Sequence, residues 1–379
     1  MHDIATNELG ILLVLAFVIF VSPYFAKITK IPIAPIEIIF GTILGYFGLI
    51  EQSATFKLVA EVGFFYLMFL AGTEIDIRAL IKTDKQVLRL ALLYISILYI
   101  VAGITGVWSN ALFLTFVVVP VMSVGVLSTL FKEYGKNEPW LNTAMIAGGI
   151  GEVISIALLT LMSAYIEFGS SAELFSSIYY LILFIALCVL GFKGLEILFW
   201  WYPNIKIMLM PHDDKAEKDI RLSMALFFST VAVMIYLNLE IVLGAFIAGS
   251  FIATFFNHKK DLPHKLGSFG FGFLVPIFFV YIGTTVDLGY LFMPGVLDNA
   301  IKLMIFMTIV RVAASLIFIK RFGLYDSILF GLSLSMPLTL LVAVATVAYN
   351  AGNIPKELYF AFIIASIFEV IISMVLIKF

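Results

Sequence analysis

The pattern of hydrophobic and polar positions is a series of long apolar stretches, separated by short polar segments from one end of the chain to the other. An apolar stretch of about 20 residues is long enough to cross a bilayer as a helix. The predicted stretches are 9–28, 32–50, 57–74, 87–108, 110–131, 141–166, 173–200, 219–237, 239–257, 265–286, 298–319, 325–349 and 355–378. The pattern predicts an all-α polytopic membrane protein with about 13 transmembrane helices.

The composition supports a protein that lies mostly in the bilayer. Of its 379 residues, 62% are hydrophobic and 13% are charged, and the mean hydropathy is +1.10. Soluble proteins have an apolar share of about 45–50%. We therefore expect residues 1–379 to form a single transmembrane domain without a soluble regulatory domain. The first residues, MHDIATNELG, lack the basic region of a cleaved signal peptide.

Two further counts narrow the class of protein. The chain has one cysteine, Cys188, inside an apolar stretch, which excludes a disulfide framework within the chain. The net charge of −2 gives no indication of a nucleic-acid partner, and membrane lipid is the expected surrounding.

Basic residues predict the orientation of the chain in the membrane. The segments that follow odd-numbered stretches contain 17 of the 23 Lys and Arg residues. These are Lys27, Lys30, Arg78, Lys82, Lys85, Arg89, Lys132, Lys136, Lys206, Lys215, Lys218, Arg221, Lys259, Lys260, Lys265, Lys320 and Arg321. Because basic loops stay in the cytoplasm, we expect the N-terminus outside and the C-terminus in the cytoplasm. A prokaryotic cell (inner) membrane is the expected location.

Two of the predicted spans contain a proline among hydroxyl residues. One reads VVVPVMSVGVLST, with Pro120 and Ser123, and the other reads GLSLSMPLTLLVAVAT, with Pro337 and Thr339. Proline interrupts a helix, and Ser or Thr can satisfy the freed backbone groups. A single proline can be a structural kink only. A matched pair in two halves of the chain predicts an inverted-repeat transporter, whose site lies where the two broken helices cross.

Glu152 is a carboxylate in the middle of an apolar span, in the sequence NTAMIAGGIGEVISIALL. Ala144, Gly148, Gly151 and Ser155 share its helical face. That face of small residues predicts that Glu152 points into the protein interior and not into lipid. Burial disfavours the carboxylate anion, so the group can hold a proton near neutral pH, and a small cation would compete with that proton. A carboxylate that is permanently paired or protonated, with a structural role, is the alternative.

Arg311 lies in the middle of another span, in MTIVRVAASLIF. A buried guanidinium stays charged and needs a partner or water. Glu152 is its first candidate partner, and Arg311 is interpreted either as a movable counter-ion or as a fixed strut. For Glu369, also within a span, the sequence suggests no partner.

The remaining intramembrane charges are expected to be structural. Glu37 caps or braces the second span, and Lys193 can pair with Glu196 three residues later. All four histidines lie in loops or near span ends. Motifs of ATP-driven pumps, metalloproteases and serine hydrolases are missing from the sequence. The sequence therefore indicates neither an enzyme nor a bound cofactor.

Five stretches in order resemble the monovalent cation:proton antiporters, in their Kef-like and Nap-like branch. The stretches are KIPIAPIEIIFGTILGYFGLI, VAEVGFFYLMFLAGTEIDIRAL, LGAFIAGSFIA, VPIFFVYIGTTVDL and IVRVAAS. The second is the most specific, because the family shows F-x-A-G-x-E-x-D at this place. The resemblance covers nearly the whole chain.

The resemblance implies an inverted-repeat fold with a dimerisation half and a core half, which includes about 87–166 and 265–349. It implies two broken helices that cross in the core and an elevator-like movement of the ion site. Glu152 then binds the transported Na⁺ or K⁺ and the proton, with Ser123 and Ser155 as further ligands and Arg311 as the intramembrane cation. A homodimer is expected, and a separate cytoplasmic subunit would have to supply any regulatory domain.

The chain departs from the family at one position of the site. The family has an acidic or amide residue before its ion-binding Asp, and this chain has Gly151 before Glu152, which is interpreted as room for the longer side chain. In the family that the chain resembles, the members with two Asp residues are the electrogenic ones. With one carboxylate here, the resemblance implies exchange of one cation for one proton, for cation extrusion or control of internal pH. The alternatives are a symporter of an organic anion with the same fold and a non-transporting membrane sensor or assembly subunit.

Overall fold

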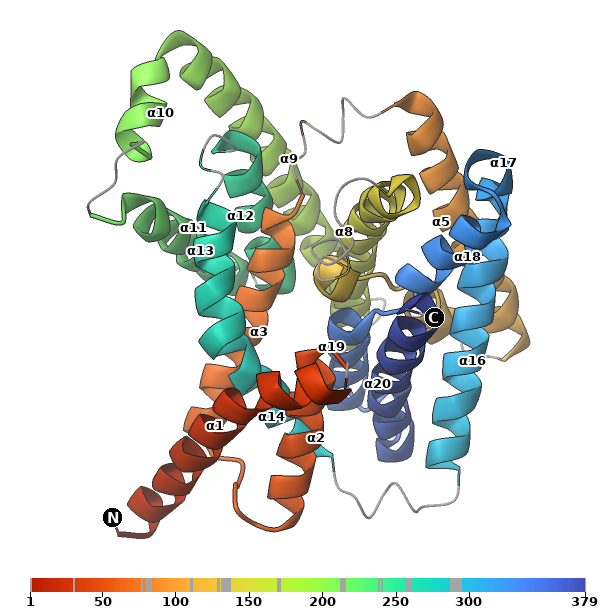
Figure 1. The fold of residues 1–379 in the computed structure, drawn as a ribbon. Helices are drawn as coiled ribbons and strands as arrows, with labels where there is room; N and C mark the ends of the chain where they lie inside the picture. Colours follow the sequence, from red (N-terminus) through yellow and green to blue (C-terminus); the bar gives the residue numbers. More distant parts are fainter. Residues whose placement is uncertain are drawn as a thin grey trace. The chain divides into compact units, whose positions relative to one another are not determined.

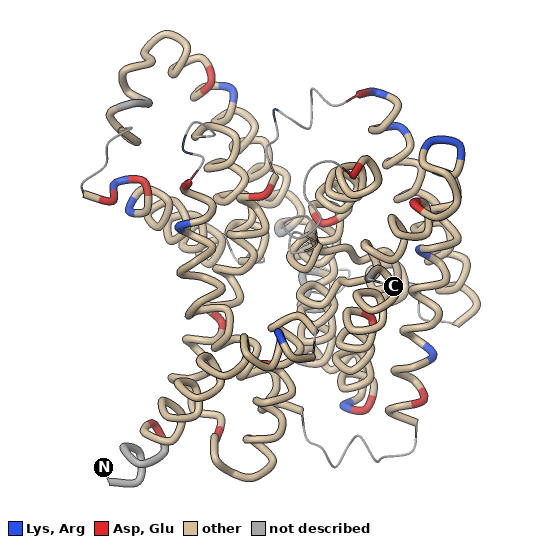
Figure 2. The backbone as a smooth tube through the Cα atoms, viewed as in Figure 1, with Lys and Arg blue, Asp and Glu red and all other residues tan. Residues whose placement is uncertain are grey.

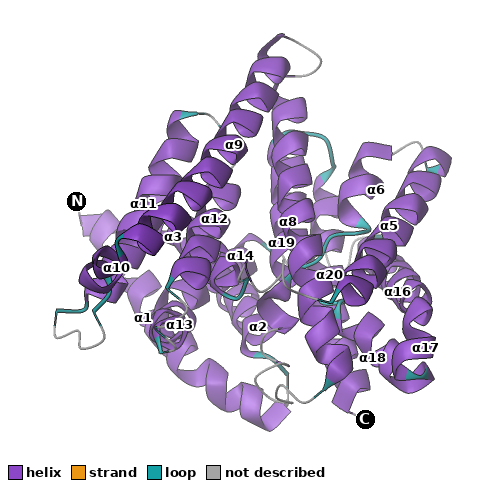
Figure 3. Ribbon diagram, turned by 90° about the horizontal axis from the view of Figure 1, so that it is seen from above, coloured by secondary structure: helices purple, strands orange, loops and turns teal. Residues whose placement is uncertain are grey.

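The computed structural model describes most of the chain. The described residues are 2–29, 31–75, 78, 84–109, 112–127, 130, 138–168, 172–211, 216–237, 239, 241–256, 259, 261–286 and 295–378. Within these ranges every regular element is a helix (Figure 3), which confirms the predicted all-α class. Ser128, in the stretch VVVPVMSVGVLST, and two of the four histidines, His212 and His258, lie outside the described residues.

The helices begin and end close to the predicted apolar stretches (Figure 1). The first half contains α1 (His2–Thr29), α2 (Ile33–Tyr46), α3 (Ala54–Thr73), α5 (Lys85–Trp108), α6 (Leu112–Val118), α8 (Pro139–Phe168) and α9 (Ala172–Trp201). The second half contains α10 (Pro203–Leu209), α11 (Lys218–Tyr236), α12 (Ile241–Phe255), α13 (Leu262–Phe269), α14 (Val275–Thr285), α16 (Val296–Ser315), α17 (Ile319–Phe322), α18 (Leu324–Ser333), α19 (Leu338–Asn350) and α20 (Lys356–Lys378).

Many of these helices have the length and hydropathy of membrane spans. Among the described residues, nine helices pass both tests, and the bent pair α18 and α19 makes a tenth. The helices α2 and α12 are apolar but shorter. Long parts of the chain carry no charged residue (Figure 2). The protein is therefore an integral membrane protein, and the count of thirteen crossings stays a prediction.

Two compact units divide the chain. The first comprises Met1–Phe64, Asp84–Ser155 and Phe271–Phe379, and the second comprises Phe65–Thr83 and Ile156–Gly270. All residues of the predicted site belong to the first unit.

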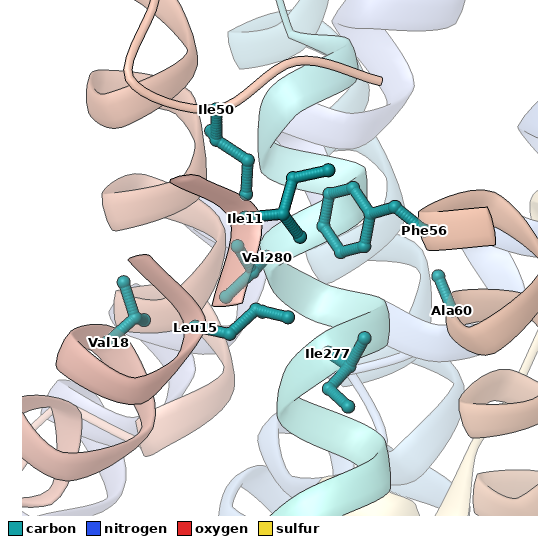
Figure 4. Close-up of a cluster of buried hydrophobic side chains, with 8 residues drawn as sticks. All are labelled: Ile11, Leu15, Val18, Ile50, Phe56, Ala60, Ile277 and Val280. Atoms are coloured by element: carbon teal, nitrogen blue, oxygen red, sulfur yellow. The ribbon is translucent and has the colours of Figure 1, made fainter. Parts of the chain in front are cut away.

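Close helix packing in the first unit rests on glycines. A Cβ atom at Gly41 of α2 would overlap the backbone of Val280 in α14, and one at Gly283 of α14 would overlap the backbone of Ile38. Beside this pair, residues of α1, α3, α14 and the segment between α2 and α3 form a buried apolar cluster (Figure 4). Its members are Ile11, Leu15, Val18, Ile50, Phe56, Ala60, Ile277 and Val280. In the same unit α16 packs along α20, and α18 and α19 also contact α20. These packed helices position the site.

The second unit uses the same kind of packing. A Cβ atom at Gly249 of α12 would overlap the carbonyl group of Phe69 at the end of α3. The Tyr66 hydroxyl donates to the Leu266 carbonyl of α13 at 3.1 Å, and the Lys265 ammonium contacts Glu217 at 3.1 Å and Asp219 at 3.4 Å. These contacts join α3, α11, α12 and α13 within this unit.

Candidate ion-binding site

Glu152 lies midway along α8 with no part of its side chain exposed. The small residues of its face are buried as well: Ala144, Gly148, Gly151 and Ser155. Val153, on the other side of the helix, is 40% exposed. The structure confirms the predicted orientation of Glu152 toward the protein interior.

The helix α6 ends at Val118, and Pro120 lies in the interruption that follows it. Residues 121–123 are not helical, and the chain becomes helical again at 124–127. Proline has no N–H to continue the helical hydrogen bonds, so the backbone groups of the interruption must find other partners. We refer to Val119–Ser123 as the first break. Its residues are buried. The Val119 and Val121 N–H groups donate to carbonyls of α6, at Thr115 and Val118, and further partners come from neighbouring helices.

Two side chains of α8 bind the first break. The Val124 backbone N–H donates to Glu152 Oε2 at 3.2 Å, and the Ser123 hydroxyl donates to Glu152 Oε1 at 3.3 Å. One turn further along α8, Ser155 Oγ accepts from the Met122 backbone N–H at 3.3 Å. The fully buried carboxylate is thus held by one backbone and one side-chain donor.

A second interruption separates α18 from α19, with a bend of 42° between them. We refer to residues 334–337 as the second break. Pro337 stands directly before α19. Hydroxyl groups satisfy nearby carbonyls, as the sequence predicts: Ser333 Oγ donates to Phe330 at 2.8 Å and Ser335 Oγ donates to Gly331 at 2.9 Å.

The two breaks meet through their hydroxyl groups. Thr339, in the first turn of α19, has its Oγ1 2.8 Å from Ser123 Oγ. Both residues are buried, at 3% and 4% exposure. Glu152, Ser123 and Thr339 therefore form a continuous chain of oxygen atoms that joins α8 to both interrupted helices.

Gly151 has a different neighbour from the one expected. A Cβ atom at this position would overlap the Met122 sulfur of the first break. At Gly148, a Cβ atom would lie 3.1 Å from Leu334 and 3.2 Å from Leu127. The glycines thus make room for the side chains of the two breaks, and the space beside Gly151 holds Met122.

Arg311 does not pair with Glu152, and that expectation was wrong. Its Nη1 donates to Glu369 Oε1 of α20 at 3.1 Å, and its Nη2 donates to the Val121 carbonyl of the first break at 2.8 Å. All of this is fully buried. The reason is that α16 packs along α20 (Figures 1 and 3), and sequence patterns do not show which helices are neighbours.

The structure also places the residues expected to have structural roles. Glu37 is buried in α2. Glu196 forms an ion pair with Arg78 at 3.4 Å. The sequence had suggested Lys193 as its partner. Among the described residues, no group of three or more His, Cys, Asp or Glu side chains is arranged to hold a metal ion.

Sequence reasoning missed three members of this site. They are the Val124 N–H and the Val121 carbonyl, which are backbone groups, and Glu369. A signal for Glu369 existed, because an intramembrane carboxylate and an intramembrane cation both need a partner.

Comparison with known proteins identifies the family of this chain. Residues 14–378 match the family described as "Sodium/hydrogen exchanger, transmembrane". The chain belongs to this family. It is 27% identical over 395 aligned positions to the protein YjbQ of Bacillus subtilis (strain 168), covering 96% of this chain and 62% of that protein. It is 24% identical to "Probable Na(+)/H(+) antiporter 3" of Methanocaldococcus jannaschii, covering 95% of this chain and 93% of that protein.

The fold also matches a solved structure of a sodium proton antiporter. The chain superposes on MjNhaP1 of Methanocaldococcus jannaschii with a TM-score of 0.67, at 18% identity, over 99% of this chain and 96% of the other. This likeness shows that this member of the sodium/hydrogen exchanger family has the antiporter fold, as its two meeting breaks indicate. Its family and its structural neighbours are transporters.

Proposed function

We propose that this protein exchanges a monovalent cation for H⁺ across the membrane, with Glu152 as the binding site that both share. The observation that carries the proposal is the fully buried carboxylate at the meeting point of two broken helices. A buried carboxylate must be neutralised, either by a proton or by a cation. Because the proton and the cation cannot occupy the carboxylate together, binding of the cation on one side of the membrane releases the proton, and binding of a proton on the other side releases the cation.

The groups around Glu152 suit a hard cation. Its own oxygens and the hydroxyls of Ser123, Ser155 and Thr339 are oxygen ligands, which alkali cations prefer to nitrogen or sulfur. The non-helical backbone of the first break adds carbonyl groups, as in other transporters with discontinuous helices. The relatives' names favour Na⁺ over K⁺ as the first ion to test.

The net reaction we propose is electroneutral. Glu152 is the only carboxylate in this chain of oxygens, and Arg311 is already paired with Glu369. One positive charge moves inward for each that moves outward, so the membrane potential does no work on the cycle.

The engagement of Arg311 argues against symport of an organic anion. Its Nη1 and Nη2 atoms already donate to Glu369 and Val121, and the guanidinium has no exposed surface on which a carboxylate substrate could bind. The proposal includes a core half of about 87–166 and 265–349, which carries the site across the bilayer. It also includes a homodimer with the N-terminus outside and the C-terminus in the cytoplasm, and a separate subunit for any regulation.

The test is transport by purified protein in liposomes that contain a pH-sensitive dye. When Na⁺ or, in a parallel assay, K⁺ is added outside, the native protein is expected to change the internal pH by moving protons. Glu152→Gln is expected to leave the internal pH unchanged. If the native protein gives no proton flux with either ion between pH 6 and about 9, the exchanger proposal falls and a sensor or assembly role is favoured. If Glu152→Gln still exchanges, transport occurs but the site lies elsewhere.

A further inference from the structure

Glu369 is a buried carboxylate on α20 for which ion exchange at Glu152 has no direct use. Its side chain has no exposed surface, and among the described residues its hydrogen-bond partner is Arg311 Nη1, at Oε1. The other oxygen, Oε2, and the Arg311 Nε atom are buried without a hydrogen-bond partner in the part of the chain that the structure describes. The pair is thus joined by a single donor and a single acceptor, and not by the bidentate geometry that makes such pairs strong.

A buried ion pair of this kind is a poor way to stabilise a helix bundle. Removing two charges from water costs several kcal/mol for each ion, and apolar residues of the same size are often as good or better. Unpaired buried polar atoms add to the cost. The pair therefore calls for a function other than stability, and that function should be visible in its contacts.

The contact that stands out is the one to the first break. Arg311 Nη2 donates to the Val121 carbonyl at 2.8 Å. The next three residues of the chain are the ones that meet α8 and α19: Met122 through its N–H, Ser123 through its hydroxyl and Val124 through its N–H. Arg311 thus fixes the start of the segment that supplies both hydrogen-bond donors to Glu152.

We propose that Glu369 is a positioning residue for the ion site, because it holds the Arg311 guanidinium on the Val121 carbonyl and so fixes the first break against Glu152. Without the charge of Glu369, the guanidinium has no buried anion on α20. It turns away from Val121, and the Ser123 and Val124 donors lose their fixed distance from the carboxylate. The cation then binds a loosened site.

This inference can be tested in a way that does not depend on transport. Amide hydrogen exchange of the full-length protein in detergent reports the opening of the Met122 and Val124 N–H groups, which side chains of α8 protect. For Glu369→Gln we expect exchange of the peptide that covers 119–127 to rise about tenfold. Ser366→Ala is the matched control, because the Ser366 hydroxyl is buried on the same helix and donates only to Ile363 of its own helix.

A second variant removes the concern that one unpaired buried charge unfolds the protein. The double variant Arg311→Met with Glu369→Leu leaves no charge behind and is expected to fold. It still lacks the guanidinium on Val121, so we expect the same rise in exchange over 119–127. Native protection of this peptide in both Glu369→Gln and the double variant would overturn the proposal.

The effect on transport rests on the proposed function and is measured separately. In liposomes, Glu369→Gln is expected to raise the cation concentration for half-maximal exchange about tenfold, with a maximal rate within about twofold of native. A lower maximal rate at unchanged half-saturation would mean a structural role and would overturn the inference. If the native protein transports nothing, the proposed function fails. The amide hydrogen exchange experiment then still decides whether Glu369 positions the first break.

Discussion

The hydroxyl oxygens of Ser123 and Thr339 lie 2.8 Å apart, although 216 positions separate these residues in the chain. Each hydroxyl comes from a helix that a proline interrupts, and Ser123 also donates to Glu152. The two halves of the sequence therefore contribute one oxygen each to the surroundings of a single carboxylate. A rearrangement of either broken helix must change the environment of Glu152, and this coupling underlies the predictions that follow.

Removal of either hydroxyl should weaken cation binding. We expect Ser123→Ala and Thr339→Val each to raise the half-saturating cation concentration about tenfold, because each loses an oxygen ligand beside a charged group. In the double variant, the half-saturating cation concentration should rise by less than the product of the two single increases, since the residues contact each other. Liposome exchange at varied cation concentration measures all three.

The control for the hydroxyl variants is Ser333→Ala. Ser333 is buried beside the second break, but its hydroxyl donates to Phe330 of its own helix. Half-saturation of this variant should stay within about twofold of native. An equal loss in Ser333→Ala and Ser123→Ala would show that any buried hydroxyl near the breaks matters, and that the Ser123 and Thr339 contact has no special role.

Gly151→Ala should destabilise the protein because its new methyl group meets the Met122 sulfur. The expected loss is about 1–3 kcal/mol in the free energy of unfolding, as for other overpacked cores. The double variant Gly151→Ala with Met122→Ala should recover part of the lost free energy of unfolding, because it removes the overlap. Thermal unfolding in detergent measures both.

Gly191→Ala is the matched control for this glycine substitution. A Cβ atom at Gly191 of α9 meets nothing within 4 Å, and alanine is the better helix former. Its melting temperature should be equal to or above that of the native protein. A melting temperature of Gly151→Ala that also matches native would contradict the packing of Met122 against α8.

Proton and cation should compete in a simple way. If both occupy Glu152, protons displace the cation as the pH falls, so the half-saturating cation concentration should rise about tenfold for each unit decrease in pH below the neutral range. The maximal rate at saturating cation should change much less. Measurement of exchange at five or more pH values gives this slope, and a half-saturating concentration that is independent of pH would exclude a shared site.

An imposed membrane potential should not change the rate or the end point of exchange. Movement of one net charge would add about 2.3 kcal/mol for each 100 mV, an effect that is easily detected. One cation for one proton moves none. Liposomes clamped at 0 and at about −100 mV with a K⁺ ionophore, assayed with Na⁺, compare the two conditions. A clear dependence on the potential would mean that a second charge takes part.

The sequence predicted the parts of this structure that depend on local patterns. The apolar stretches located most helices to within a few residues, because hydropathy and length determine what can lie in a bilayer. The start of α1 at His2 and the short helix α10 (Pro203–Leu209) were not predicted. Pro120 and Pro337 marked both breaks, since a missing N–H interrupts any helix. The small residues around Glu152 predicted its buried face correctly, because helical periodicity determines which side chains lie together.

The parts that the sequence did not predict depend on which helices are neighbours. Arg311 was assigned to Glu152, and it binds Glu369 and the Val121 carbonyl. Nothing in the pattern of either span indicates that α16 lies along α20. The role of Gly151 was likewise missed, because the side chain that fills its space, Met122, comes from a distant part of the chain.

The most direct test of the shared site is the number of protons released when the purified protein binds its cation. Isothermal titration with Na⁺ in two buffers of different ionisation enthalpy gives that number without any transport. The account predicts about one proton per bound cation for the native protein, and neither binding nor proton release for Glu152→Gln. Cation binding without proton release, or unchanged binding by Glu152→Gln, would contradict it.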